Sequence, residues 1–131
     1  MRQITNSIIY LSIFLSISSC YNHKEIDGSY SLTTMKTYDS IFLKKDNSFI
    51  HKIYNSKRQL VLDEKGKWKM INNNRIELNM YYNNGNTDIN KYLDSEFVNK
   101  FRVISSFPVY YNGNHITIEV DSDNNLLYIK K

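Results

Sequence analysis

Alternation of apolar and polar residues with a period of two is the feature that most constrains the fold of this chain. In the stretch 75–82, for example, Ile76, Leu78, Met80 and Tyr82 fall on one side of an extended backbone and polar residues on the other. Side chains of a strand point alternately to opposite faces, so this pattern is typical of a half-buried strand. It indicates strands at 28–33, 40–44, 48–54, 59–63, 66–71, 75–82, 108–111, 115–120 and 126–130.

Short turns rich in Asn separate several of these segments. They lie at 45–47, 72–74 and 112–114, and the last of them contains Asn112-Gly113. Asn tolerates a positive φ, and Asn-Gly is the strongest short-range hairpin signal. Strands spaced by roughly 8–12 residues are typical of an all-β barrel or sandwich. We therefore predict an all-β fold, an antiparallel up-and-down β-barrel of about eight strands.

One segment, 88–101, departs from the period of two. Its apolar residues recur near helical spacing, without Gly or Pro, at Ile89, Tyr92, Leu93, Phe97 and Phe101. Two readings stay open here, a short helix or a loop followed by a strand.

Size and composition indicate one globular domain. The chain has 131 residues, of which 41% are hydrophobic and 23% are charged. These values exclude a two-domain enzyme, a coiled coil and a collagen-like repeat. Its single Cys excludes a disulfide framework and a Cys-rich zinc site. We assign the barrel domain to 28–131.

The first 19 residues, 1–19, have the pattern of a lipoprotein signal peptide. Arg2 precedes the uncharged apolar stretch 8–17, which is too short to span a membrane. The following Ile17-Ser18-Ser19-Cys20 matches the bacterial lipobox, in which the thiol of the Cys receives a diacylglycerol before cleavage. We therefore predict that Cys20 is lipidated. The alternative is an ordinary secretory signal in which Cys20 has no such role.

This signal predicts the location and the first partner of the protein, a membrane bound through the lipid on Cys20. Tyr21 stands where an Asp signals inner-membrane retention, so we expect the outer membrane of a Gram-negative bacterium. Residues 20–27 are expected to form a polar tether. Removal of Arg2 lowers the formal net charge from +4 to +3, and nucleic acid is not an expected partner. Oligomeric state and the side of the membrane are left open.

Three segments together give a resemblance to a known group. They are Gly28-Ser29-Tyr30, the run 41–49, and Gly66-Lys67-Trp68 ahead of an Asn-rich turn. In this order they resemble small bacterial lipocalin-like (calycin-type) lipoproteins. The lipocalin signature has its Gly-x-Trp in the first strand, whereas here it stands in mid-chain. The resemblance implies a barrel that binds a small apolar ligand.

Such a ligand would contact the inward faces of two neighbouring strands. The candidate ligand-binding residues are Trp68, Met70, Leu78, Met80 and Tyr82. The interior of an eight-stranded barrel is just wide enough to be filled by side chains or to hold one small ligand. A barrel filled by these residues and Phe49 would leave no room, and would favour a different function.

The residues that usually carry metal or calcium chemistry lack the necessary spacing. His23, His51 and His115 show no HxH or HxxxH pattern, and a zinc site needs three or four converging ligands. The run 121–125 resembles the start of a calcium loop, but Leu126 stands at the position of the invariant Gly. We predict a turn at 121–125, with no metal site and no cofactor.

Catalytic residues are not predicted either. Glu77 and Glu119 alternate with apolar neighbours and are expected to face solvent, and Asp63-Glu64 and Asp94 with Glu96 are expected in loops or a helix. The chain has no G-x-S-x-G motif and only four Gly. We therefore predict that the protein is not an enzyme.

Tyrosine is the remaining signal. Tyr81-Tyr82 and Tyr110-Tyr111 place adjacent rings on opposite faces, so one ring of each pair is expected outside the core. Exposed Tyr favours protein interfaces, and the lysines 65, 67 and 69 on one strand face favour an anionic partner or simply a solvated edge. Two functions follow: a lipid-anchored binding module for a small apolar ligand or envelope component, or a protein-interaction lipoprotein of the inhibitor or immunity type with a Tyr-rich face.

Overall fold

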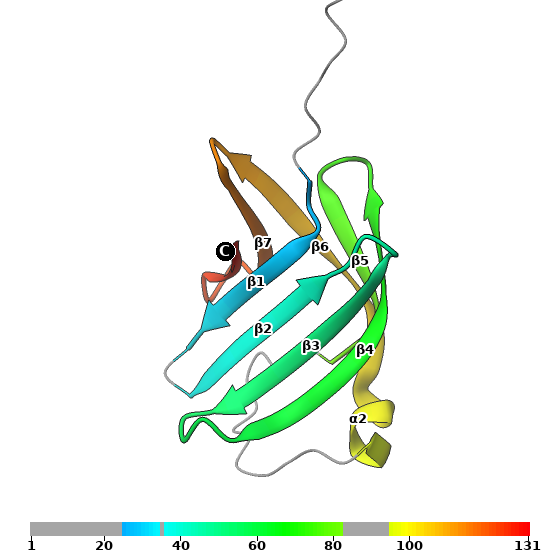
Figure 1. Cartoon of the computed structure of the whole chain (residues 1–131), viewed down its shortest axis with the longest axis vertical. Coiled ribbons are helices and arrows are strands. Elements are labelled where there is room, and N and C mark those ends of the chain that lie inside the picture. Colours follow the sequence, from blue (N-terminus) through cyan, green and yellow to red (C-terminus); the bar gives the residue numbers. More distant parts are fainter. Residues whose placement is uncertain (1–24, 35, 83–94) are drawn as a thin grey trace, which may run out of the picture.

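The chain forms a closed antiparallel barrel of eight strands, seen here in a computed structural model that describes residues 25–34, 36–82 and 95–131 (Figure 1). Each strand pairs with the next along the chain, and the last returns to the first. The strands are β1 Gly28–Thr33, β2 Thr37–Leu43, β3 Ser48–Asn55, β4 Leu60–Ile71, β5 Arg75–Tyr82, β6 Arg102–Asn112, β7 His115–Asp121 and β8 Leu126–Lys130. A short helix, α2 Ser95–Phe101, precedes β6. The predicted up-and-down barrel is confirmed.

The predicted strand limits need two corrections. The segments 59–63 and 66–71 form one continuous strand, β4, and β6 begins six residues before the predicted 108–111. Of the ambiguous segment 88–101, the part 95–101 is helical, while 88–94 lies outside the described residues. The Asn-rich turns are confirmed, because Asn47, Asn72 and Asn73 have φ between 51° and 62°.

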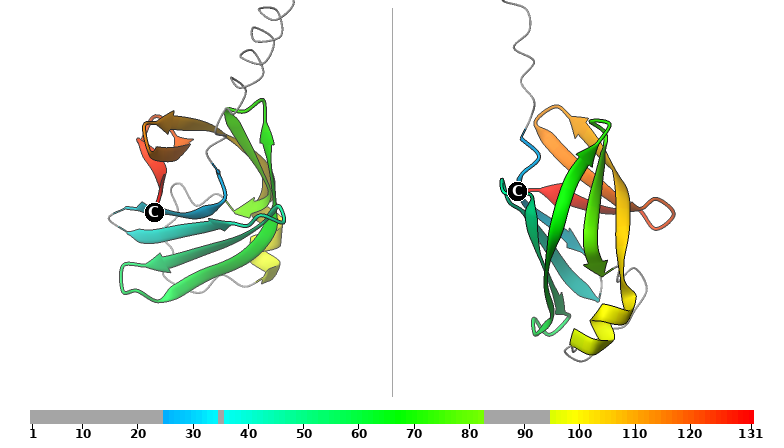
Figure 2. Two further views of the ribbon diagram at one scale, coloured as in Figure 1. Left: turned by 45° about the horizontal axis from the view of Figure 1, so that its top comes forward. Right: turned by 90° about the vertical axis from the view of Figure 1, so that its right-hand side faces the viewer.

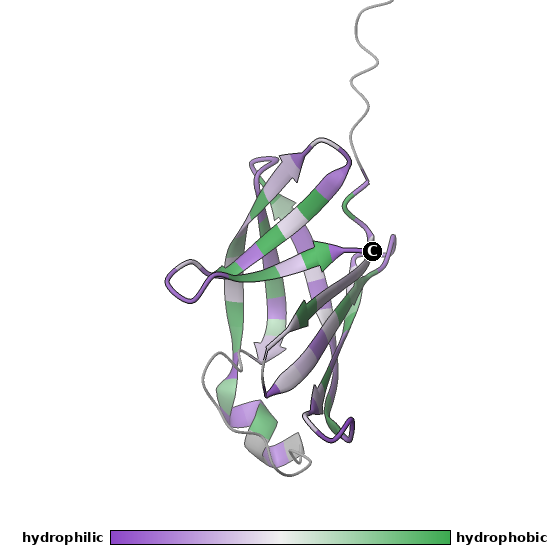
Figure 3. Cartoon of the chain, turned by 90° about the vertical axis from the view of Figure 1, so that its left-hand side faces the viewer, coloured by the Kyte–Doolittle hydropathy of each residue, from purple (hydrophilic) through white to green (hydrophobic). Residues whose placement is uncertain are grey.

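Large side chains fill the interior between the strands. The views of Figure 2 show the strands enclosing this interior, and Figure 3 shows hydrophobic and hydrophilic residues alternating along them. The core side chains are Tyr30, Ile41, Leu43, Phe49, Trp68, Ile76, Leu78, Tyr81, Phe107, Val109, Ile116, Ile118 and Tyr128, with Ile26 at one end. The aromatic rings of Tyr30, Phe49, Tyr81 and Tyr128 are at most 1% exposed. Interior positions are thus occupied by bulky groups, as expected for a packed small barrel.

Gly66 explains why β4 resembles two strands in the sequence. It pairs directly with Phe49 on β3, whose ring lies across it. A Cβ atom at this position would stand 2.2 Å from the carbonyl oxygen of Asn79 and 2.5 Å from the Phe49 ring. The glycine therefore permits close packing of a ring on the backbone, at the cost of interrupting the apolar alternation.

A β-bulge in β5 changes the predicted facing of its last residues. The pairing of β5 with β6 shifts between Leu78 and Tyr81, and Met80 has a positive φ of 68°. The extra residue of the bulge shifts the inward–outward alternation of the following side chains by one position. Met80 consequently points outward and is 43% exposed, whereas Tyr81 and Tyr82 are both buried. The predictions that Met80 faces inward and that one ring of this Tyr pair lies outside are wrong.

A second hydrophobic cluster lies where α2 packs against the barrel. Val98 of the helix is grouped with Ile53 of β3, with Val61 and Leu62 of β4, and with Tyr82 of β5. Figure 1 places α2 at the lower end of the barrel. Among the described residues, no helix has the length and hydropathy needed to cross a membrane.

The barrel closes through a short seam between its first and last strands. Tyr30 pairs with Lys130 and Ser31 pairs with Ile129, and the Lys131 amide donates a hydrogen bond to the Ser29 carbonyl. Both core clusters and all strand pairs lie between residues 26 and 130. A chain that begins at Tyr21 therefore contains the complete barrel and its core.

Candidate functional site

The residues predicted to bind a ligand do not form one surface. Trp68 and Leu78 are buried in the main core, and Met70 packs against its edge. Tyr82 belongs instead to the cluster under α2, and Met80 lies on the outside of the barrel. The Trp68 indole is tied to the β2–β3 turn, since its Nε1 donates to the Lys44 carbonyl at 2.9 Å.

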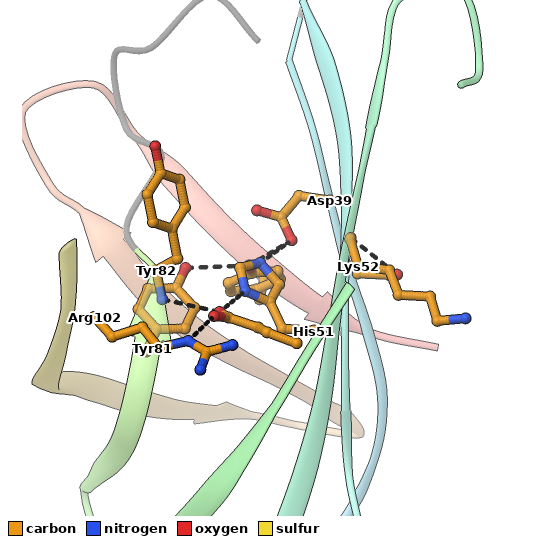
Figure 4. Close-up of polar contacts among 9 residues, drawn as sticks. Asp39, His51, Lys52, Tyr81, Tyr82 and Arg102 are labelled. Carbon is orange, nitrogen blue, oxygen red and sulfur yellow. Dashed lines mark hydrogen bonds and ion pairs between the residues drawn. The ribbon is translucent and has the colours of Figure 1, made fainter. Parts of the chain in front are cut away.

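The candidate site that sequence reasoning missed is a buried charge network inside the barrel. We use this name for Asp39, His51, Glu64, Arg102, Tyr81 and Tyr128. Six different strands contribute one residue each, because β2, β3, β4, β5, β6 and β8 all send a side chain to the same place. Figure 4 shows His51 at its centre, with Lys52 on the opposite side of the sheet.

His51 is held between two carboxylates. Its Nε2 lies 2.9 Å from Asp39 Oδ1 and its Nδ1 lies 2.6 Å from Glu64 Oε1, and the ring is 0% exposed. Burial by itself lowers the pKa of His51, but the Asp39 and Glu64 carboxylates outweigh it and raise the pKa to about 9. Both ring nitrogens then donate, and His51 is an imidazolium at neutral pH. The Tyr81 ring stacks on it with 4.8 Å between centroids.

The two carboxylates have further partners. Glu64 accepts hydrogen bonds from the Tyr82 amide at 2.9 Å and from Arg102 Nε at 3.2 Å. Asp39 accepts from the Tyr128 hydroxyl at 2.6 Å, and the Tyr128 oxygen lies 3.2 Å from that of Tyr81. Two carboxylates therefore face two cations, which balances the charge within the network. A buried ion pair tolerates the loss of solvation only with such additional hydrogen bonds.

This arrangement is suited to fixing structure and not to proton transfer. A general base needs a free lone pair within reach of a substrate, and both His51 nitrogens are already engaged. The described residues include no group of three or more His, Cys, Asp or Glu that could hold a metal ion. The network's contacts specify how six strands align, because a slip of one residue in any of them would separate charges in the interior.

The outside of the barrel is divided into a charged half and an uncharged half. On β3, β4 and β5 the outward residues include Lys52, Asp63, Lys65, Lys67, Lys69, Arg75 and Glu77. On β8, β1 and β2 the outward residues are Leu127, Ile129, Ser29, Ser31, Thr33, Tyr38, Ser40 and Phe42, with no Asp, Glu, Lys or Arg. We call this second set the uncharged band.

The uncharged band exposes large apolar side chains. Ile129 is 50% exposed and Phe42 is 43% exposed. Strand pairing extends the band through Thr117 of β7 to Tyr110 of β6, whose ring is 49% exposed. Charges are depleted and aromatic side chains enriched at the centre of protein–protein interfaces. The outward residues of β8, β1 and β2 have that composition. One charge borders the band on each side, because the Arg58 guanidinium lies 3.7 Å from the centre of the Tyr38 ring and Glu119 pairs with Leu127.

Comparisons with known proteins do not identify the chain. No family model, curated protein or solved structure matches it. The functional proposal therefore rests on two features of contrasting chemistry. One is a sealed interior in which the polar groups of the charge network bind one another, and the other is an outer band that exposes apolar groups.

The other predicted residues are placed as follows. His115 lies exposed at the start of β7, and His23 lies outside the described residues. Asp63 and Glu64 lie in β4 and not in a loop or helix, and Glu64 is buried. Asp121 accepts hydrogen bonds from the Asp123 and Asn124 amides, which confirms a turn at this position.

Proposed function

We propose that this chain is a lipid-anchored protein-interaction module of the bacterial cell envelope, which binds a partner protein through the uncharged band. The segregation of charge on the barrel surface carries the proposal. A solvated strand surface normally carries charged residues that prevent association, as β3, β4 and β5 do here. The absence of such residues from the outward positions of β8, β1 and β2, together with exposed Ile129 and Phe42, favours a protein-binding surface.

The filled interior favours this function over the binding of a small apolar ligand. Four aromatic rings and Leu78 lie in the barrel interior at 1% exposure or less, and both ring nitrogens of His51 already have carboxylate partners. A ligand carrier of the lipocalin type requires an open interior. The resemblance to lipocalin-like lipoproteins remains a prediction.

The first test concerns the anchor. Replacing Cys20 with Ala is expected to move the protein from the membrane fraction to the soluble fraction, because the diacylglycerol attaches to that thiol. Cell fractionation followed by immunoblotting measures the change, and Ser18→Ala serves as the control because it keeps a small residue ahead of the cleavage site. Continued membrane association of Cys20→Ala would contradict lipid anchoring.

The second test concerns the uncharged band. A photo-crosslinking residue at Ser31, in the middle of the band, is expected to give one defined protein adduct in cells. The same residue at Lys67, on the charged half, is expected to give at least tenfold less of it. Adding Ile129→Glu should reduce the Ser31 adduct at least tenfold, because it places a charge at the centre of the interface. The control Lys65→Glu should leave it unchanged.

Two results would contradict the protein-binding proposal. One is an equal adduct yield from both crosslinking positions, or none from either. The other comes from native mass spectrometry of the chain that begins at Tyr21: a reproducible small-molecule mass that is lost on denaturation would replace the proposal with a ligand carrier.

A further inference from the structure

One end of the barrel carries a groove next to the start of the described chain. The groove has a volume of about 590 Å³ and is lined by Glu25, Asn114, His115, Ile116, Lys130 and Lys131. These residues come from the segment before β1, from the β6–β7 turn with the start of β7, and from the end of β8. In Figure 1 the segment that leads into β1 lies at the upper end, opposite α2.

Most of the charged side chains at the rim of the groove are basic, namely Lys45, Lys130 and Lys131 against Glu25. The only carboxylate side chain in the lining belongs to Glu25, and it forms an ion pair with Lys45 at 3.5 Å. The Glu25 carbonyl accepts a hydrogen bond from Lys130 Nζ. Besides Glu25, the lining side chains that carry or can carry a charge are Lys130, Lys131 and His115. Ammonium and amide donors of this kind suit phosphate oxygens.

The same end also carries side chains typical of a membrane interface. Tyr111 pairs with Ile116 at the barrel rim, and its ring is 41% exposed. Amphipathic Tyr rings are enriched at the level of lipid headgroups, with Lys nearby. The predicted anchor lies close as well, because Cys20 is only five residues (25 − 20) before Glu25. Five extended residues span at most roughly 18 Å, so the lipid on Cys20 would hold this end near the bilayer.

We propose that this end of the barrel rests on the membrane and that its groove binds the phosphate of an anionic lipid headgroup through Lys130 and Lys131. This inference rests on the proposed lipid anchor for its orientation, but headgroup binding is a property of the groove itself. In this orientation the barrel contacts the membrane with its Lys-bearing end. The uncharged band, on the side of the barrel, does not lie against the membrane and is open to a partner.

The test uses the chain that begins at Tyr21, which lacks the acyl group. It is expected to float with vesicles of phosphatidylcholine that contain about 30% phosphatidylglycerol, an anionic lipid, and not with vesicles of phosphatidylcholine alone. Lys130→Gln with Lys131→Glu should lower the partition coefficient at least tenfold. The matched pair Lys65→Gln with Lys67→Glu, on the side of the barrel, should change it less than twofold.

Equal losses from both pairs would overturn the proposal in favour of non-specific charge attraction, and so would equal binding to both kinds of vesicle. Thermal melting checks that each variant is folded. If the double variant is unfolded, the test is repeated with Lys131→Glu alone, which leaves the β1–β8 pairing intact. Failure here with Cys20→Ala still released from membranes would reject only the groove. Failure of the anchor would leave vesicle binding unaffected.

The acylated protein provides an independent measurement. Trp68 is the only tryptophan, and its indole binds the Lys44 carbonyl next to Lys45, at the same end as the groove. In vesicles, its fluorescence is expected to be quenched at least twofold more by spin labels on headgroups than by labels deep in the acyl chains. Equal or negligible quenching by both labels would contradict the docked orientation.

Discussion

Replacing His51 with Ala is expected to lower the free energy of unfolding by about 3–5 kcal/mol, a large part of the total stability of a small domain. The imidazolium is 0% exposed and bridges Asp39 and Glu64. Its removal leaves two carboxylates in the interior with only Arg102 to balance them, and also opens a space beside the Tyr81 ring. Urea unfolding followed by circular dichroism measures the loss.

The same residue predicts a pH dependence in the wild-type protein. The pKa of His51 is raised from 6.5 to about 9 in the folded state. Folding therefore binds a proton, so this contribution to stability is complete below about pH 6.5 and is lost as pH rises through about 9. The loss amounts to about 3 kcal/mol by the linkage relation. Burial and the nearby Asp39 carboxylate raise the pKa of Tyr81 and Tyr128, so these hydroxyls remain neutral over that range.

Two controls separate this effect from general alkaline destabilisation. His115→Gln removes an exposed imidazole from β7 and should leave the pH profile unchanged. Nitrogen-15 NMR of the wild type should show both His51 nitrogens protonated at pH 8. A neutral His51 at that pH, or a stability that stays flat between pH 6.5 and 9, would contradict the charged bridge.

Replacing Trp68 with Ala is the second change with a large expected effect, a loss of about 3–5 kcal/mol in the free energy of unfolding. The side chain is 9% exposed and belongs to the main core. Its indole also secures the β2–β3 turn, because Nε1 donates to the Lys44 carbonyl. The substitution removes the ring and leaves the Lys44 carbonyl without its side-chain donor.

Chemical denaturation at pH 7 checks the Trp68 prediction against a matched aromatic residue. Tyr110→Ala removes a ring that is 49% exposed on β6, and should cost less than about 1 kcal/mol. Similar costs for the two substitutions would place Trp68 outside the core and weaken the argument for a filled barrel.

The barrel could be predicted because local patterns determine it. Alternation locates the strands, and Asn residues with positive φ locate the hairpins that join them in sequence order. Two local exceptions misled the prediction. Gly66 interrupts the apolar pattern of β4 because the Phe49 ring lies on its backbone, and Met80 adopts a bulge conformation that shifts the facing of Tyr81 and Tyr82. Both depend on contacts with another strand, which a period cannot reveal.

The charge network could not be predicted for the same reason. His51 lies 12 residues after Asp39 and 13 residues before Glu64, and the three meet only through the register of β2, β3 and β4. Tyr128 joins from a strand 89 residues after Asp39. A weak signal did exist: His51 falls at an inward position of its strand, between Phe49 and Ile53, where a polar residue requires a buried partner.

The seam between β1 and β8 has a consequence for how the protein is made. The sheet keeps two free edges until residues 30 and 130 pair, so the barrel closes only after the last strand has been added. Contacts between residues so far apart in sequence form slowly. Until then β1 and β8 present unpaired backbone groups, which are templates for aggregation. If the protein is exported unfolded, as its proposed lipid anchor implies, this open state forms outside the cell interior. A chaperone in that compartment would then protect the unpaired strands until β8 closes the barrel.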